Sequence, residues 1–399
     1  MKKITTIWWG NGQSNLLDWL FTILGDKIKI SSIVSMSDDG RTTWELMRAF
    51  EDELWLHLPP PWDLRRCLFS LSNSDYREYF KLIFEYTFLN EEKISHFSIL
   101  ELFKQANKEL LFFWKAWIYK NELEEFEFDR WNLYSILNSK LNEYFKFILP
   151  LKSSINWHKF WNILMANLYY NLWKDYDKMI DFMHNLLEVT WEVIPVTTKK
   201  AYIRAILWNW EIIESQDRIS NVANYNSWIA DLELMECSMD ATHNNRAHKA
   251  IIESDYIVIW PWDLFTSIIS NFIIGWVQDS IKQTNAKIIY IWNSTNKWWE
   301  TTGLTQLDFV NKIERFLWRR LDYFVINNKK LNLDNEQLAQ FKNDISVKWW
   351  DYLFLSLWEK KELERRKITI LESNLLWDNS FYKHSKEKIV SELSAIFFA

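Results

Sequence analysis

The sequence has very little glycine and an excess of tryptophan. Its 399 residues contain 6 glycines and 27 tryptophans, whereas an average usage of about 7% would give roughly 28 glycines. A folded α/β protein needs glycine for tight turns and for helix C-caps. The shortfall of roughly 22 glycines is about as large as the excess of tryptophan. We therefore expect many tryptophans to stand at positions that fold as glycine positions.

Other absences exclude whole classes of protein. Two cysteines are too few for a disulfide scaffold or a cysteine-rich zinc module. The formal net charge of -6 argues against a general nucleic-acid binder. The apolar stretch 256–277 contains Pro261 and Asp263 and does not resemble a membrane span. Met1 leads directly into a strand-like segment without a signal-peptide cleavage site, so we expect a cytoplasmic protein that binds neither membranes nor nucleic acid.

The tryptophans stand in turn-like surroundings, often in pairs. Trp8 and Trp9 precede Gly10, and another pair flanks Pro261. A core tryptophan instead stands alone within an apolar periodic pattern. Our hypothesis is that most of these positions are glycine in the native protein, because some bacteria read the codon UGA as glycine. The alternative is a genuinely tryptophan-rich protein, such as a carbohydrate binder. The coding DNA or an intact mass would separate the two.

The hydrophobic pattern alternates between strands and helices. Apolar, β-branched runs predict strands, whereas i, i+3, i+4 spacing predicts helices. Such alternation is typical of a three-layer, doubly wound, mostly parallel Rossmann-like α/β sheet. We predict one domain over 1–399 with a helical insertion at 76–149. Strands are expected at 2–8, 29–36, 192–196, 201–207, 256–259, 285–291 and 323–327, with one more strand and a closing helix in 367–399; helices are expected at 14–24, 44–50 and, as a pair, 157–187.

The loop after the first strand has the composition of a phosphate-binding turn. Gly10, Asn11, Gly12 and Ser14 lie between a strand and a helix, where open backbone N–H groups and the helix dipole favour an anion. An ordinary tight turn is the alternative.

At the end of the second strand, the turn 38–40 carries two acidic candidates followed by glycine; these residues are Asp38, Asp39 and Gly40. The carboxylates could accept hydrogen bonds from ribose hydroxyls or hold a divalent cation, or they could belong to a solvated turn.

Two more polar loops follow predicted strands. Asp263, Thr266 and Ser267 come at the start of a helix, where hydroxyls and free amides suit a phosphate or a sugar, or simply cap the helix. Asn293 precedes the polar stretch 300–302, which by itself is also compatible with a solvated loop. Ligands of doubly wound sheets bind outside the carboxyl ends of the strands, so these loops are candidates for one site.

Few residues offer direct chemistry. His158 could contact a ligand or act as a general base, although a lone histidine is more often structural. No CxxC or HExxH spacing indicates a resident metal site. Neither Cys67 nor Cys237 has a nearby histidine that suggests a nucleophile, so we expect both to be inert.

Taken in order along the chain, the motifs resemble those of the YvcK-like gluconeogenesis factor family, within the CofD-like phospholactate transferase superfamily. Family glycines repeatedly fall on tryptophans here. Arg66, Lys159, Asp263 and Phe265 replace asparagine, serine, serine and tyrosine of the family motifs. The matching segments are 8–14 (G-G-G-T-G-x-S), 38–44 (D-D-G-G-S-S-G), 60–68, 157–162 (G-H-S-F-G-N), 260–268 (G-P-G-S-L-Y-T-S-I), 293–304 and 382–384.

The resemblance implies a protein that binds a nucleotide sugar of the UDP-N-acetylglucosamine type. It implies a regulatory role in gluconeogenic growth, cell shape and wall synthesis, with no resident cofactor, and it leaves regulatory protein partners and a homo-oligomer open. It also implies ligand contacts at Asp63, Arg65, Asn162 and Lys383. The alternative is an enzyme that moves a phospholactyl-type group from a guanosine diphosphate carrier to a deazaflavin. A nicotinamide dehydrogenase is disfavoured because no convincing acid–base set is present.

Overall fold

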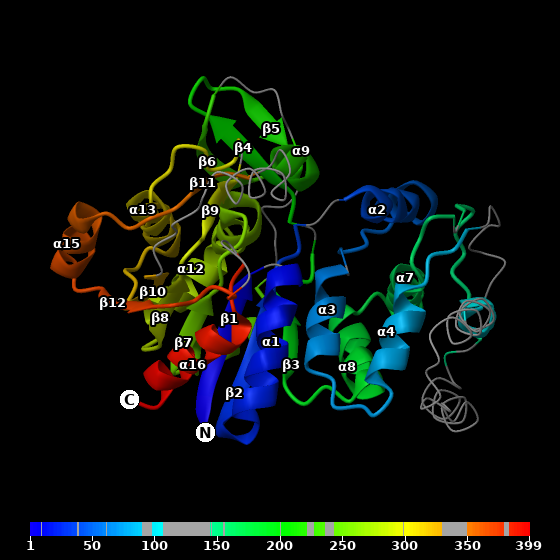
Figure 1. Ribbon diagram of the computed structural model, residues 1–399. Helices are drawn as coiled ribbons and strands as arrows, with labels where there is room; N and C mark the ends of the chain where they lie inside the picture. The colour runs from blue at the N-terminus through cyan, green and yellow to red at the C-terminus, as the bar shows by residue number, and fades with distance from the viewer. Residues whose placement is uncertain are drawn as a thin grey trace. The chain divides into compact units, whose positions relative to one another are not determined.

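The chain forms two compact units, Met1–Asp39 with Trp191–Ala399, and Gly40–Thr190. The computed structural model describes residues 1–8, 10–37, 40–60, 62–89, 98–106, 144, 146–154, 156–199, 201–221, 227–235, 243–297, 299–328, 349–378 and 383–399 (Figure 1). The predicted insertion at 76–149 belongs to the second unit, and much of it, 107–143, lies outside the described residues. The prediction of a single domain stays a prediction.

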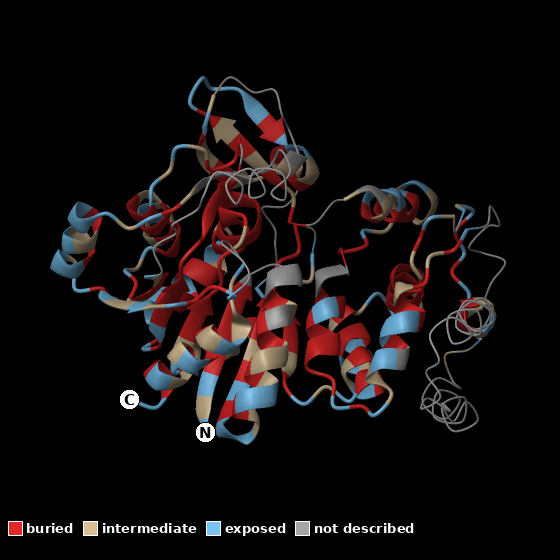
Figure 2. Cartoon of the chain, viewed as in Figure 1, coloured by how far each residue is buried: buried red, intermediate tan, exposed pale blue. Residues whose placement is uncertain are grey.

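A seven-stranded parallel sheet is the centre of the first unit, as predicted. Its strand order is β12-β10-β8-β7-β1-β2-β3, and every neighbouring pair is parallel. Ile4 of β1 lies between Ile30 of β2 and Tyr256 of β7. Most positions of these strands are buried (Figure 2), which explains their nearly continuous apolar, β-branched sequences. The strands are β1 Lys2–Trp8, β2 Ile28–Val34, β3 Glu192–Pro195, β7 Tyr256–Ile259, β8 Lys287–Ile291, β10 Tyr323–Asn327 and β12 Thr369–Ser373.

Helices flank this sheet and complete a three-layer α/β fold. From β1 to β2 the chain moves one way along the sheet, and from β7 to β8 it moves the other way. Because such crossovers are right-handed, the connecting helices cover opposite faces. α1 packs on α16, whereas α10, α12, α13 and α15 pack on one another in succession. Their bounds are α1 Gly10–Leu24, α10 Asn245–Ile252, η4 Leu264–Ile269, α11 Ser270–Phe272, α12 Gly275–Gln283, α13 Gln306–Leu317, α15 Leu357–Arg365 and α16 Lys386–Phe397, with η1 Gly25–Lys27 after α1.

Two small antiparallel sheets accompany the parallel sheet in the first unit. The predicted strand at 201–207 exists, but it does not join the parallel sheet. It is the middle strand β4 of a three-stranded sheet of order β5-β4-β6, because its neighbours in sequence pair with it directly. These elements are β4 Ile203–Leu207, β5 Ile212–Glu214, α9 Gln216–Asn221 and β6 Ile229–Leu234, and the other sheet pairs β9 Thr295–Lys297 with β11 Trp349–Tyr352.

The second unit is helical in its described part. Aromatic side chains form much of its core: Phe84 packs against Phe160 and Trp161, with ring centroids 5.7 and 5.3 Å away. The predicted helix at 44–50 and the predicted helix pair at 157–187 are confirmed, although 157–159 is extended rather than helical. The helices are α2 Arg41–Leu54, α3 Trp62–Ser70, α4 Arg77–Glu85, α7 Phe160–Asn171 and α8 Tyr176–Leu187.

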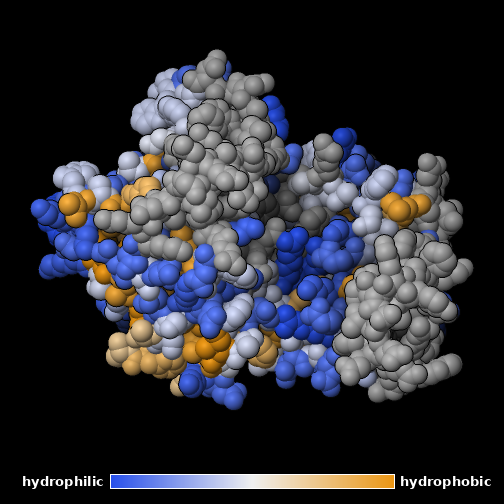
Figure 3. Space-filling model, viewed as in Figure 1, coloured by the Kyte–Doolittle hydropathy of each residue, from blue (hydrophilic) through white to orange (hydrophobic). Residues whose placement is uncertain are grey.

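The surface of the molecule is largely polar on the face shown in Figure 3. Hydrophilic side chains predominate over α15, in keeping with its Glu- and Lys-rich sequence. Among the described residues, no helix combines the length and apolar character that crossing a bilayer requires.

Tryptophan occupies left-handed backbone positions throughout the described chain. Ten described non-glycine residues have positive φ, and six of these are tryptophan. Positive φ costs an L-residue roughly 1–2 kcal/mol, which is why glycine usually stands there. Trp157 and Trp299 also occupy glycine positions of the family motifs, Trp299 in the pattern N-x-x-x-x-P-G-E-T-D-G-Y that segment 293–304 resembles. The backbone thus supports the interpretation of these positions as glycine positions; they are Trp55, Trp157, Trp173, Trp210, Trp299 and Trp318, with φ between 54° and 72°.

We predict that Trp173→Gly and Trp210→Gly stabilise the protein. Both side chains are more than 80% exposed, so little burial is lost, and each change relieves a positive φ, which should raise the free energy of unfolding by about 0.5–1 kcal/mol. Urea denaturation measures the change. Trp358→Gly is the control, since Trp358 is also exposed but lies in helix α15; there glycine should cost roughly 0.5 kcal/mol. Equal effects at all three positions would contradict the prediction.

Candidate functional site

The strand order of the parallel sheet reverses between β1 and β7. In chain order the sheet reads 3-2-1-4-5-6-7, and the carboxyl ends of β8, β7, β1 and β2 lie side by side. Open sheets bind ligands at such a reversal, because the connections leave in opposite directions and open a crevice between them. The structure therefore places the predicted residues after β1, β7 and β8 at one edge of the first unit.

Helix α1 begins directly at the end of β1, at Gly10. Its first-turn N–H groups have no partner within the helix, so its N-terminus favours an anion. The buried side chain of Gln13 fixes this turn to the sheet, since its Nε2–H group donates to Thr6 Oγ1, 3.0 Å away, and to Ser32 Oγ. Sequence reasoning missed Gln13, although it lies within the recognised motif. The side chains of Asn11 and of Trp8 lie outside the description.

The loop after β7 meets a buried carboxylate. Glu300 Oε1 accepts hydrogen bonds from the backbone N–H groups of Phe265 and Thr266, at 2.9 and 3.1 Å, and from Thr266 Oγ1 at 3.3 Å. The expectation of free amides at this helix start is therefore wrong at these two residues, because a side chain of the protein itself occupies them. Ser267 is fully buried, and its hydroxyl has no partner in the described part of the chain.

Lys297 lies between two carboxylates in the same loop region. Its ammonium group pairs with Glu300 Oε2 at 2.9 Å and with Asp263 Oδ2. All three side chains are at most 10% exposed. Burial by itself would lower the pKa of Lys297, but the carboxylates of Glu300 and Asp263 outweigh burial and raise it. Lys297 is therefore charged and fully engaged. Nothing in the sequence distinguishes this buried lysine from the exposed ones.

Asn293 connects the loops after β7 and β8. Its Oδ1 accepts from the Tyr290 hydroxyl at 2.7 Å, and its Nδ2 donates to the Trp262 carbonyl at 2.8 Å. The Gln306 side chain binds the Asn293 carbonyl, 2.9 Å away. The side-chain oxygen and nitrogen of Asn293, which we predicted to contact a ligand, thus both have protein partners. Asn293 fixes the position of the two loops.

The C-terminal segment approaches the same edge. His384 Nε2 lies 3.0 Å from the Trp292 carbonyl, and the His384 ring contacts the rings of Trp292 and Trp260, which follow β8 and β7. Burial lowers the pKa of His384 to about 4, so the imidazole is neutral at pH 7. The predicted residue beside it, Lys383, is exposed.

Besides Gly40, four predicted residues belong to the second unit: Asp63, Arg65, His158 and Asn162. Arg65 pairs with Glu85 at 2.9 Å, and Lys159 pairs with the same carboxylate. Desolvation raises the pKa of Glu85, but the charges of Arg65 and Lys159 lower it further than burial raises it. The Asp63 side chain is not described.

His158 and Asn162 are buried at the start of α7. The backbone N–H groups of Phe88 and Trp157 donate across an extended pairing of 86–88 with 157–160, which fixes the segment before the helix. His158 Nδ1 and Asn162 Oδ1 have no partner in the described part of the chain. Burial lowers the pKa of His158 to about 4. Two buried polar atoms without partners make this helix start a candidate for ligand contact.

No group of three potential metal ligands occurs among the described residues. Asp38 and Asp39, the predicted candidates for a divalent cation or a ribose, lie outside them. The cation therefore stays a prediction.

We predict that Lys297→Met lowers the free energy of unfolding by about 3–5 kcal/mol, because it leaves two buried carboxylates without their cation. Lys287→Met is the control: Lys287 also pairs with an aspartate, at 2.7 Å, but is 56% exposed, and its loss should cost at most about 1 kcal/mol. Asp263→Asn combined with Lys297→Met should recover part of the loss. Chemical denaturation measures all three, and equal losses at Lys297 and Lys287 would refute the prediction.

We predict that neutral His158 makes the protein sensitive to acid. Its pKa is about 4 when folded and about 6.5 ordinarily, so the unfolded chain takes up the proton first. The stabilisation is present above about pH 6.5 and is lost as the pH falls toward 4, by roughly 3 kcal/mol. His158→Gln should reduce this pH dependence of stability, of which His384, with a pKa lowered equally by burial, keeps its own part, whereas His57→Gln, at an exposed side chain, should not reduce it. An unchanged slope in His158→Gln would disprove the assignment.

Comparison with known proteins supports the fold and identifies the family. The family model described as "2-phospho-L-lactate transferase CofD" matches residues 4–376. Proteins named "Putative gluconeogenesis factor" are similar: one from Thermotoga maritima is 23% identical over 82% of this chain and 79% of its own length, and one from Streptococcus pyogenes is 22% identical over 86% of both. A UPF0052-family crystal structure from Bacillus halodurans has the same fold, with a TM-score of 0.70, 18% identity and 99% coverage of both chains. Because the family match spans nearly the whole sequence, the protein belongs to the CofD family.

Proposed function

We propose that the protein binds a nucleotide sugar of the UDP-N-acetylglucosamine type at the carboxyl edge of the parallel sheet and acts as a regulatory gluconeogenesis factor. The observation that carries the proposal is the start of α1 at the reversal of strand order between β1 and β7. A diphosphate at that point interacts with several backbone N–H groups and with the positive end of the helix dipole.

The charges of the loops decide where the diphosphate lies. At the start of η4, Glu300 already occupies the N–H groups of Phe265 and Thr266, and its charge would repel a phosphate. Lys297 is engaged by two carboxylates. The diphosphate therefore lies on the first turn of α1, at Gly10 to Gly12. The loop after β7 is left to uncharged groups of the ligand, for which the buried Ser267 hydroxyl is available.

The remaining predicted contacts complete the proposal. Asp38 and Asp39 engage the ribose or a divalent cation, and the predicted residues of the second unit and Lys383 contribute further ligand contacts. The relatives' name supports a role in gluconeogenic carbon metabolism. Action in the cytoplasm, with effects on cell shape and wall synthesis and through protein partners or a homo-oligomer, belongs to the same proposal.

Phosphoryl-group transfer is the second candidate function. The description of the matching family model names a 2-phospho-L-lactate transferase, and this favours it. Such an enzyme would move a phospholactyl-type group from a guanosine diphosphate carrier to a deazaflavin. Incubation with both substrates and detection of product by mass spectrometry distinguishes turnover from binding alone; we expect binding of the nucleotide sugar without product.

We predict saturable binding of UDP-N-acetylglucosamine by isothermal titration calorimetry, and a loss of at least tenfold in affinity in Gly12→Asp. The new carboxylate in the first turn of α1 suits the helix dipole, so the helix still forms, but it repels the diphosphate. Trp358→Asp is the matched control, since it places an aspartate in the first turn of α15, at an exposed side chain. It should bind as the parent does.

The same titration is made with glycine at positions 8 and 9, where indole rings would crowd the loop. Tighter binding by this variant is expected if these positions are glycine in the native protein. Absence of heat at millimolar ligand in both backgrounds, or parental affinity in Gly12→Asp, would contradict the proposed site.

A further inference from the structure

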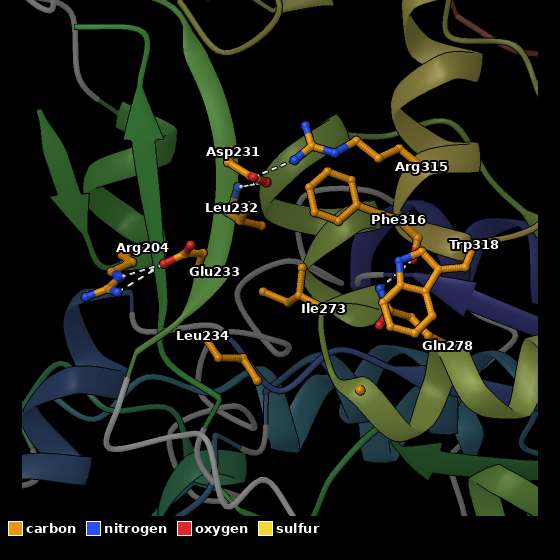
Figure 4. Close-up of a pocket in the computed structure, with 11 residues that line it drawn as sticks. Arg204, Asp231, Leu232, Glu233, Leu234, Ile273, Gln278, Arg315, Phe316 and Trp318 are labelled. Atoms are coloured by element: carbon orange, nitrogen blue, oxygen red, sulfur yellow. Dashed lines mark hydrogen bonds and ion pairs between the residues drawn. The ribbon is translucent and has the colours of Figure 1, made fainter. Parts of the chain in front are cut away.

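A cavity of about 630 Å³ lies beside the small antiparallel sheet of the first unit (Figure 4). One wall is strand β6. The other wall is formed by the start of α12 and the end of α13, where Ile273, Phe316 and Trp318 line it. In Figure 4 the side chains of β6 stand on one side, and Phe316 and Trp318 stand on the other. The volume falls within the range of roughly 300–1,000 Å³ that is usual for ligand pockets.

Strand β6 is an edge strand of the described sheet. The order is β5-β4-β6, with Arg204 opposite Glu233 and Ile206 opposite Asp231. The N–H group of Met235 donates to the Tyr202 carbonyl at 2.9 Å in the same register. Antiparallel pairs alternate between bonded and non-bonded positions. The main-chain groups of residues 231, 233 and 235 therefore point toward β4, and those of Leu232 and Leu234 point away from it.

The cavity runs along this outer edge. Four consecutive residues of β6, 231–234, line it, which is the pattern expected when the edge of a strand rather than one face borders a space. The N–H group of Leu232 donates to Asp231 Oδ1 at 2.9 Å, and Arg315 holds Asp231 Oδ2 at 2.5 Å. A carboxylate thus covers one outward N–H group, a common protection of edge strands.

The chemistry of the lining selects the class of ligand. Its two arginines, Arg204 and Arg315, each pair with an acid of β6, Glu233 and Asp231, so its formal charge is zero. An anion such as a nucleotide finds no unpaired cation among these residues. The outward main-chain groups and the apolar side chains, Leu232 and Phe316 among them, instead match a neutral polypeptide backbone with apolar side chains.

We propose that this cavity binds an extended peptide segment of a partner protein, which adds to β6 as a further strand. The segment bonds to the main chain of Leu234, which is the more exposed of the two outward residues, and at Leu232, which is 2% exposed, its carbonyl must displace Asp231 from the N–H group. Its apolar side chains lie against Phe316 and Ile273. Strand addition of this kind obtains affinity from main-chain hydrogen bonds and specificity from alternate side chains. The site is separate from the proposed nucleotide site, so either can fail without the other.

The probe is a phage-displayed library of random 12-residue peptides, selected on the full-chain protein. Gly275→Tyr, which fills the cavity, is kept out of the selection and serves as the test variant: a Cβ at Gly275 would meet nothing within 4 Å, so the change is tolerated. The enriched peptide is synthesised, and its affinity is measured by fluorescence polarisation. We expect enrichment on the parent protein and a loss of at least tenfold in affinity in Gly275→Tyr.

Leu234→Pro tests the main-chain bond itself. Proline removes the outward N–H group but leaves the ladder to β4 intact, so peptide affinity should fall at least tenfold, whereas Leu234→Val should stay within twofold. A peptide N-methylated at alternate residues should also lose binding. Circular dichroism checks folding, and Gly275→Tyr decides if Leu234→Pro does not fold. Absence of enrichment, or binding that survives both Leu234→Pro and N-methylation, overturns the proposal.

Discussion

The pairing of β1 with β2 on one side and with β7 on the other is the constraint on which the rest of the first unit depends. It divides the sheet into two halves whose connections leave in opposite directions. The position of the start of α1 and of the neighbouring loops follows from that division. Buried residues such as Thr6 and Gln13 then hold the first turn of α1 against the strands.

A side chain of the protein itself occupies the start of η4, where Glu300 accepts hydrogen bonds from two backbone N–H groups. An internal carboxylate neutralises the positive end of a helix as a bound phosphate would. In the proposed site, an anionic group therefore lies at the start of α1 rather than at η4, and this would orient a ligand that carries its charge at one end.

The sequence allowed the parallel sheet and its helices to be predicted, because buried parallel strands are continuous apolar runs that need no long-range information. The strand at 201–207 was found, but its partners were not, since pairing within a small antiparallel sheet depends on contacts that no local pattern records. Of the candidate residues, those after β1, β7 and β8 do gather at one edge. The sequence could not show that Thr266 and Asn293 already have hydrogen-bond partners within the protein. Those partners are the side chains of Glu300 and Tyr290, and only the folded structure brings them together.

The buried set Asp263, Lys297 and Glu300 has an evolutionary consequence. Loss of Lys297 alone would leave two desolvated carboxylates, whereas loss of Asp263 alone leaves Lys297 paired with Glu300. An exchange at 297 should therefore follow or accompany an exchange at 263, with a neutral pair such as serine and glutamine as the counterpart of aspartate and lysine. Positions 263 and 297, which are 34 residues apart in the chain, are therefore expected to evolve in a coupled way.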